Sequence, residues 1–159
     1  NERNVINVLE IGSAIGYSAL KMANEGAFVT TIERDEKRYK KALEFIEISN
    51  LKDNVKLINN DALNTNITEY FDMIFIDAAK AQNIKFIQKF KNNLKEDGFI
   101  IIDNVDFHGL VGKSNQIESK NLRGLVRKIE EFLRFLDEQN EFEVKKINIG
   151  DGLILLERK

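Results

Sequence analysis

Short apolar runs alternate along the chain with longer segments in which apolar residues recur every three or four positions. The short runs are rich in β-branched residues and end at polar residues or glycine, which is typical of strands. They cover residues 5–11, 28–32, 55–58, 73–76 and 99–102. The longer segments have the period of an amphipathic helix, as in the stripe Ile84, Ile87, Phe90 and Leu94. This alternation predicts a parallel sheet with helices on both faces.

The last third of the chain has a different pattern. Its longest helical stripe begins near Ser119 and should end before Phe142. The residues that follow form two apolar runs around Gly-Asp-Gly at 150–152, and Asp-Gly favours a tight hairpin turn. We therefore predict one α/β domain over residues 1–159, with a doubly wound, mostly parallel sheet that ends in an antiparallel hairpin.

Composition narrows the class of protein. A chain of 159 residues with 43% hydrophobic and 31% charged residues has the size and make-up of one soluble globular domain. Its apolar runs are too short to cross a membrane. The absence of cysteine excludes disulfides and thiolate metal sites, and with no targeting signal visible it predicts a cytoplasmic location. A net charge of -2 gives no overall basic footprint for nucleic acid.

A glycine loop follows the first predicted strand, in the sequence LEIGSAIGYS. Gly12 and Gly16 would let the backbone turn tightly and approach a ligand, although their spacing departs from the G-x-G-x-x-G pattern of dinucleotide sites. Glu33 ends the second strand, 23 residues after Glu10, which is close to the spacing of an acid that binds ribose hydroxyls. The loop and the acid together indicate a nucleotide-like ligand. Taken singly, they would be turn glycines and a solvated strand end or helix cap.

Acidic residues also follow two later strands. Asp77 follows one strand, and Asp103 and Asn104 end the next. Neighbouring parallel strands lie about 5 Å apart, so these oxygens can converge on a hard cation such as Mg²⁺. The alternatives are a helix N-cap and an Asx turn. Lys80 favours the metal site, because a cation in the first turn of a helix needs an anionic neighbour; the lone His108 is expected to be a bystander.

From about Val8 to its carboxyl terminus, the chain resembles the S-adenosylmethionine-dependent, metal-dependent O-methyltransferases of the catechol and caffeoyl-CoA type. The matching motifs are VLEIGSAIGYSA, TIERD, FDMIFIDAAKAQ, GFIIIDNVDFHGLV and IGDGLILLER. The resemblance implies a Rossmann-like class I methyltransferase fold with seven strands, and a homodimer. It also implies amino-terminal helices that wall the substrate pocket. Since the chain opens at Asn1 without Met, we expect that segment to be missing from this sequence.

The resemblance also assigns roles to individual residues. The cofactor would be S-adenosylmethionine, bound by Glu10, Gly12, Gly16, Ser18, Glu33, Asp61, Ala62 and Asp77. The metal would be Mg²⁺ or another hard divalent cation, bound by Asp77, Asp103 and Asn104. Lys80 would be the catalytic residue.

The acceptor remains open between two chemical classes. The motifs IERDEKRY, IDAAKAQ and DNVDFHGLVG look most like the bacterial tRNA 5-hydroxyuridine methyltransferases, which form 5-methoxyuridine. A catechol or a caffeoyl-CoA-like small molecule is the alternative. Candidate phosphate contacts are Lys113, Lys120, Arg123, Arg127 and Lys128, which would otherwise form a solvated helix face. More distant alternatives are a nicotinamide-dependent oxidoreductase and a non-catalytic binding module.

Overall fold

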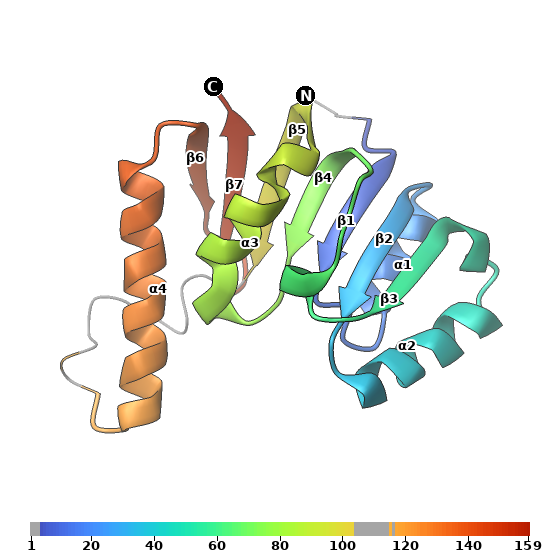
Figure 1. Ribbon diagram of the computed structural model, residues 1–159, viewed down its shortest axis with the longest axis horizontal. Helices are drawn as coiled ribbons and strands as arrows, with labels where there is room; N and C mark the ends of the chain where they lie inside the picture. Colours follow the sequence, from blue (N-terminus) through green and yellow to red (C-terminus); the bar gives the residue numbers. More distant parts are fainter. Residues whose placement is uncertain (1–3, 104–114, 116) are drawn as a thin grey trace.

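A computed structural model describes residues 4–103, 115 and 117–159 of the chain. Within these residues one mixed sheet of seven strands has the order β3-β2-β1-β4-β5-β7-β6 (Figure 1). The strands are β1 (Asn7–Ile11), β2 (Phe28–Glu33), β3 (Val55–Asn59), β4 (Phe71–Ile76), β5 (Leu94–Asp103), β6 (Phe142–Ile147) and β7 (Leu153–Arg158). The α-helices are α1 (Tyr17–Asn24), α2 (Glu36–Ile48), α3 (Asn83–Phe90) and α4 (Lys120–Glu138). Short 3-10 helices are η1 (Lys52–Asn54), η2 (Ala62–Asn64), η3 (Lys80–Gln82) and η4 (Lys91–Asn93).

The strand directions confirm the predicted architecture. Strands β1 to β5 run parallel, and β7 pairs antiparallel with both β5 and β6. Between β6 and β7 the amide of Gly152 donates to the carbonyl of Ile149 at 3.0 Å. Gly150 and Gly152 have φ angles of 57° and 80°, which glycine adopts at little cost. The Gly-Asp-Gly sequence therefore forms the hairpin turn that it predicts.

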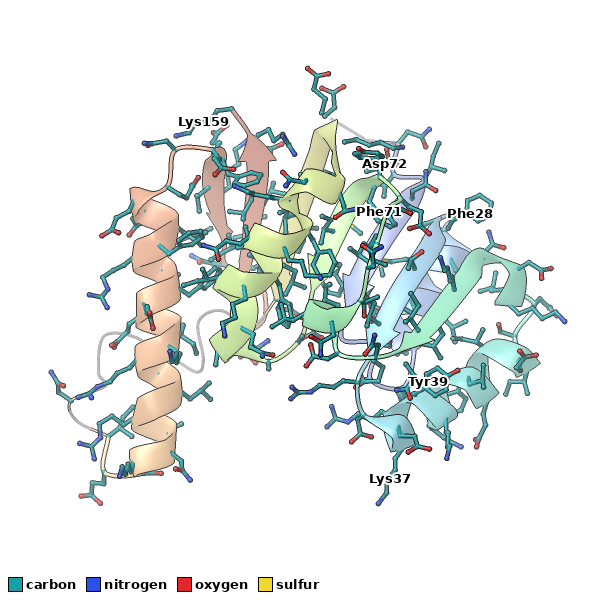
Figure 2. All side chains as sticks on the ribbon, viewed as in Figure 1. Phe28, Lys37, Tyr39, Phe71, Asp72 and Lys159 are labelled. Carbon is teal, nitrogen blue, oxygen red and sulfur yellow. The ribbon has the colours of Figure 1, made fainter. Side chains whose placement is uncertain are left out.

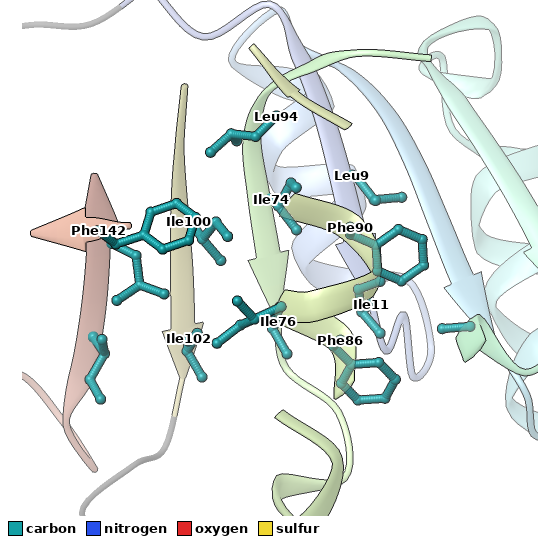
Figure 3. Packing of buried hydrophobic residues seen from close by; sticks show 14 of the residues in the cluster. Leu9, Ile11, Ile74, Ile76, Phe86, Phe90, Leu94, Ile100, Ile102 and Phe142 are labelled. Carbon is teal, nitrogen blue, oxygen red and sulfur yellow. The ribbon is translucent and has the colours of Figure 1, made fainter. Parts of the chain in front are cut away.

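Two apolar clusters cover the sheet. On one face, strand side chains such as Leu9, Ile74 and Ile100 pack with Phe86 of α3 (Figure 3). Phe132 of α4 belongs to the same cluster. The other cluster joins β1, β2 and β3 to α1 and α2. Apart from these clusters, strand side chains and Val5 line an apolar hollow of about 320 Å³ over β5, β6 and β7.

One predicted helical position is wrong. Leu94 follows the stripe of α3 at helical spacing, but α3 ends at Phe90 and Leu94 begins β5, where it pairs with Phe71. Its side chain is buried in the same apolar cluster as that of Phe90. Leu94 is four residues after Phe90, so a buried strand residue occurred at the spacing expected for the next turn of the helix.

The longest helix agrees closely with its prediction. Helix α4 runs from Lys120 to Glu138, and the side chain of Ser119 accepts a hydrogen bond from the amide of Leu122 as its N-cap. The buried residues of α4 are Val126, Ile129, Phe132 and Leu136, which form one stripe. A long, strongly periodic segment with a capping serine contains enough local information to fix both of its ends.

The amino edge of the sheet is tied together by Asp72. Its carboxylate accepts from the amides of Ile6 and Asn7 at 3.1 and 2.7 Å and from the ammonium of Lys95 at 2.8 Å. Figure 2 shows Phe28 and Asp72 at this edge, at the opposite end of the sheet from Tyr39. The carboxyl ends of the parallel strands thus form the other edge, where α/β sheets bind ligands.

At that carboxyl edge, the loops after β1 and β4 touch through their backbones. The amide of Asp77 donates to the carbonyl of Ile11 at 3.0 Å. Gly12 has a φ angle of 100°, and a Cβ atom there would lie 2.2 Å from the carbonyl oxygen of Asp77. Position 12 therefore requires glycine for two separate reasons, the positive φ and the close approach.

We predict that Gly12→Ala destabilises the protein much more than a Gly→Ala substitution at a position that has a positive φ but no close neighbour. Gly26 also has a positive φ, but a Cβ atom there would have no neighbour within 4 Å, and Gly124 of α4 lies in open space. In urea unfolding, Gly26→Ala should cost about 1 kcal/mol, Gly12→Ala roughly 3 kcal/mol or more, and Gly124→Ala should stabilise by about 0.5 kcal/mol. Equal losses for Gly12→Ala and Gly26→Ala would contradict the contact with Asp77.

Candidate functional site

A cavity of about 310 Å³ lies at the carboxyl edge of the sheet. Its size is at the lower end of the range of small-molecule sites, roughly 300–1,000 Å³. Five of the predicted cofactor residues line it: Gly12, Glu33, Asp61, Ala62 and Asp77. These residues follow or end four neighbouring strands, so the sheet brings together side chains that are far apart in the sequence.

Glu33 is held firmly at the end of β2. It is only 5% exposed, and its two carboxylate oxygens accept from the amides of Ala14 at 2.9 Å and Asp35 at 2.8 Å. Each carboxylate oxygen has a second lone pair, so Glu33 can still accept hydrogen bonds from ribose hydroxyls. Its position is compatible with the predicted ribose contact.

Asp61 and Ala62 form the end of the cavity beyond β3. The Asp61 side chain accepts from the amide of Leu63 at 2.8 Å and caps η2, which turns Ala62 into the buried wall. Phe86 of α3 and Ile32 of β2 add apolar surface nearby. This mixture of an apolar wall and a few polar groups is typical of a site for a planar heterocycle.

Glu10, Gly16 and Ser18 are not among the lining residues of the cavity. Glu10 is fully buried, and the hydroxyls of Ser18 and Thr31 donate to its two oxygens. Burial raises the pKa of Glu10 above its ordinary value, and the bonds from Ser18 and Thr31 work in the opposite direction. Gly16, with a φ of 85°, packs against Ala42 of α2. Their predicted contacts with the cofactor stay predictions.

Lys80 lies between the ends of β4 and β5. Its ammonium donates to the backbone oxygen of Asp103 at 3.0 Å and lies 3.5 Å from Oδ1 of Asp77. The Lys80 side chain is 17% exposed, so this ion pair is shielded from water more than a surface pair is. The sheet therefore brings together Asp77, Lys80 and Asp103 as the sequence predicts.

The alternative role of Asp77 as a helix cap is wrong. The N-cap residues of η3 and α3 are Ala79 and Gln82. Asp77 instead lines the cavity and faces Lys80. Asp77 therefore lies where the cavity meets the Lys80 ammonium.

Two of the three predicted metal ligands lie at the ends of adjacent strands of the sheet. Asp77 and Asp103 follow the paired residues Ile76 and Ile102 of adjacent strands, and both contribute an oxygen near Lys80. Among the described residues, no group of three or more His, Cys, Asp or Glu side chains could hold a metal ion. Asn104, the predicted third ligand, lies outside the described residues, as do His108 and Lys113. Two carboxylates fit the oxygen chemistry of Mg²⁺ but do not by themselves complete a site.

Several functional candidates were not predicted from the sequence. Arg34 and Arg38 line the cavity beside Glu33, and Gln82, the last residue of η3, lines it as well. The sequence did contain a signal for the two arginines, because they stand four residues apart directly after Glu33 and so would lie on the same face of a helical turn. Thr31 was not predicted from the sequence either, because its contact with Glu10 depends on the pairing of β1 with β2.

The basic residues of α4 are only partly available for a ligand. The Arg123 guanidinium donates to the backbone oxygen of Glu118 at 3.2 Å, and Lys128 pairs with Glu131 at 3.4 Å. Lys120 and Arg127 are exposed.

No membrane-spanning helix is found among the described residues. Each helix in residues 4–103 and 117–159 is too short or too polar to cross a bilayer.

Comparison with known proteins identifies the family. The O-methyltransferase family model matches residues 3–159. A caffeoyl-CoA O-methyltransferase of Populus kitakamiensis is 32% identical, over 98% of this chain and 71% of the relative. A Staphylococcus aureus protein named for the caffeoyl-CoA O-methyltransferases has a crystal structure that is 38% identical with a TM-score of 0.92, over 98% of this chain and 77% of that one.

A second solved structure bears on the cofactor. The Bacillus cereus O-methyltransferase in complex with SAH, the demethylated cofactor, is 29% identical with a TM-score of 0.81, over 98% of this chain and 74% of that one. The chain belongs to the O-methyltransferase family, as an S-adenosylmethionine-dependent enzyme of the caffeoyl-CoA type with the class I methyltransferase fold.

Proposed function

We propose that this enzyme transfers methyl groups in a Mg²⁺-dependent reaction to a hydroxyl that has a second oxygen beside it, and that its acceptor is 5-hydroxyuridine in tRNA. The observation that supports the reaction is the position of Lys80. Its ammonium reaches Asp103 at 3.0 Å and Asp77 at 3.5 Å, and Asp77 also lines the cofactor cavity. A cation next to the methyl donor is suited to an acceptor that must become an anion.

The chemistry requires an oxyanion in line with the methyl carbon. The acceptor hydroxyl loses its proton, its oxygen forms a bond to the methyl carbon, and the bond from that carbon to the sulfonium breaks. As an ammonium, Lys80 would stabilise the developing oxyanion, and as a neutral amine it would receive the proton, while the walls of the site hold the two reactants in line. The proton leaves to solvent, and the products are the methyl ether and S-adenosylhomocysteine.

Asp77, Asp103 and Asn104 would hold the metal. When bound there, the metal would supply a Lewis acid that lowers the pKa of the acceptor hydroxyl. Asp77 would then have two partners, the metal and Lys80. The position of Asp77 between the cofactor cavity and Lys80 supports this double role.

The two acceptor classes meet the same chemical requirement. In 5-hydroxyuridine the 5-hydroxyl lies beside the 4-carbonyl, and in a catechol the two hydroxyls are adjacent. The tRNA proposal is supported by the motifs IERDEKRY and IDAAKAQ and by exposed Lys120 and Arg127 on α4. The second candidate, a catechol or caffeoyl-CoA-like molecule, is supported by the name of the poplar relative.

Two further proposals concern the state of the protein. We infer a cytoplasmic location from the absence of cysteine and a homodimer from the resemblance to the family. Size-exclusion chromatography with light scattering distinguishes a dimer from a monomer of 18.3 kDa.

We predict that Lys80→Met lowers kcat by roughly 10²–10⁴-fold while the affinity for S-adenosylhomocysteine changes little. The reason is that Lys80 is not among the residues that line the cofactor cavity. Lys85→Met is the matched control, because Lys85 is exposed on α3, the helix that directly follows η3. Retention of more than half of the wild-type kcat in Lys80→Met would exclude the catalytic role.

We predict that Asp103→Ala removes Mg²⁺-dependent transfer, with a loss on the order of 10²-fold or more, and leaves the fold intact. Circular dichroism and isothermal titration with Mg²⁺ would measure the fold and the metal affinity. Asp97→Ala is the control, because Asp97 is exposed at the other end of β5. Unchanged transfer in Asp103→Ala, or unchanged wild-type transfer in EDTA, would remove the metal from the mechanism.

The acceptor proposal predicts where a labelled methyl group goes. With labelled S-adenosylmethionine and Mg²⁺, we expect label in tRNA that contains 5-hydroxyuridine and much less in a panel of catechols and caffeoyl-CoA. Unmodified tRNA is the matched control, because it offers the same phosphates without the hydroxyl. Label in the small molecules alone would reject the tRNA acceptor and favour the second candidate.

A further inference from the structure

Glu10 is a buried acid that the proposed reaction does not use. It lies in β1, is fully buried, and is not among the residues that line the cofactor cavity. Its partners come from three different places: Thr31 from β2, Ser18 from the first turn of α1, and Ser13, through Thr31, from the glycine loop. Glu10 and Thr31 are directly paired in the sheet.

The direction of these hydrogen bonds follows from the chemistry of the groups. An ionised carboxylate can only accept, so Ser18 and Thr31 both donate their hydroxyl protons to Glu10. Thr31 has one hydroxyl proton, which is already used, so Ser13 must be the donor in its bond with Thr31. Thr31 is therefore the link between the glycine loop and Glu10, since it accepts on one side and donates on the other.

This network holds the glycine loop at both ends. Ser13 fixes the loop just after Gly12, and Ser18 fixes the helix that begins after Gly16. Both attachments end on the same carboxylate, and Ser13 and Thr31 are 2% and 0% exposed. A buried network whose hydroxyls are all bonded gives the loop a single conformation.

The order of the strands indicates which part of the cofactor this loop meets. Along the sheet, the cavity residues run from Asp61 after β3 and Glu33 of β2 to Gly12 after β1 and Asp77 after β4. If Glu33 binds the ribose, the methyl donor must lie on the side of β4 and Lys80. The glycine loop after β1 then faces the methionine end, and the base lies toward Asp61.

We propose that Thr31 is a positioning residue for the methionine end of the cofactor, which acts through Glu10 and the serines at the two ends of the glycine loop. This rests on S-adenosylmethionine as cofactor and on the ribose contact of Glu33. It depends on neither the metal nor the acceptor.

Two ligands and three variants test the proposal. S-adenosylhomocysteine contains the amino-acid end, whereas 5′-methylthioadenosine ends just beyond the ribose. Thr31→Val keeps the shape but removes both the donor and the acceptor, and Thr31→Ser keeps them. Thr30→Val is the matched control, because Thr30 precedes Thr31 in β2 and points to the opposite face of the sheet.

We expect titration calorimetry to show roughly tenfold weaker binding of S-adenosylhomocysteine to Thr31→Val, with the affinity for 5′-methylthioadenosine unchanged. Thr31→Ser should restore the affinity, and Thr30→Val should resemble wild type. In turnover, Thr31→Val should raise KM for S-adenosylmethionine more than it lowers kcat.

Three outcomes would overturn the proposal: equal weakening of both ligands, no weakening of either, or failure of Thr31→Ser to restore binding. If Thr31→Val does not fold, Ser13→Ala removes the same attachment from the loop side and must give the same ligand dependence. Failure of wild-type protein to methylate the proposed acceptors leaves these binding results valid, so the two proposals fail separately.

Discussion

The backbones of Gly12 and Asp77 lie so close together that no side chain fits between them. This contact holds the loop after β1 against the loop after β4, so residues of both loops line the same site. On one side of it Glu33 and Asp61 line the cofactor cavity, and on the other side Asp77 meets Lys80. Methyl transfer needs the donor and the acceptor at van der Waals distance, and the missing side chain at position 12 is what allows the two halves to approach.

The sheet also sets the order of the chemical groups. The strand sequence β3, β2, β1, β4, β5 presents in turn the wall at Ala62, the acid Glu33, the glycine loop, Asp77 and Asp103. Parallel strands are about 5 Å apart, so this row has roughly the length of an extended nucleoside with its amino-acid tail.

Sequence patterns predicted the features that depend on local order along the chain. Periodicity located α4, the Gly-Asp-Gly turn located the hairpin, and the acids at strand ends located Asp77 and Asp103. The prediction failed at Leu94, where strand burial imitates a helical position. Local sequence pattern predicts an element well when the residues of that element alone determine its position and type.

The contacts that the sequence did not predict depend on pairing between distant segments. Glu10 and Thr31 are 21 residues apart, and only the register of β1 against β2 brings their side chains together. An isolated threonine in an apolar run gives no sign that it will serve as both donor and acceptor in a buried network. Of the three predicted metal ligands, Asp77 and Asp103 are described by the structure, and Asn104 lies outside the described residues.

The Lys80 ammonium donates a hydrogen bond to the main-chain carbonyl of Asp103. Every residue type presents the same carbonyl at that position, so this hydrogen bond does not depend on which amino acid occupies it. A substitution at position 103 therefore leaves the main-chain acceptor of the Lys80 ammonium in place, whatever it changes in the side-chain chemistry at this strand end.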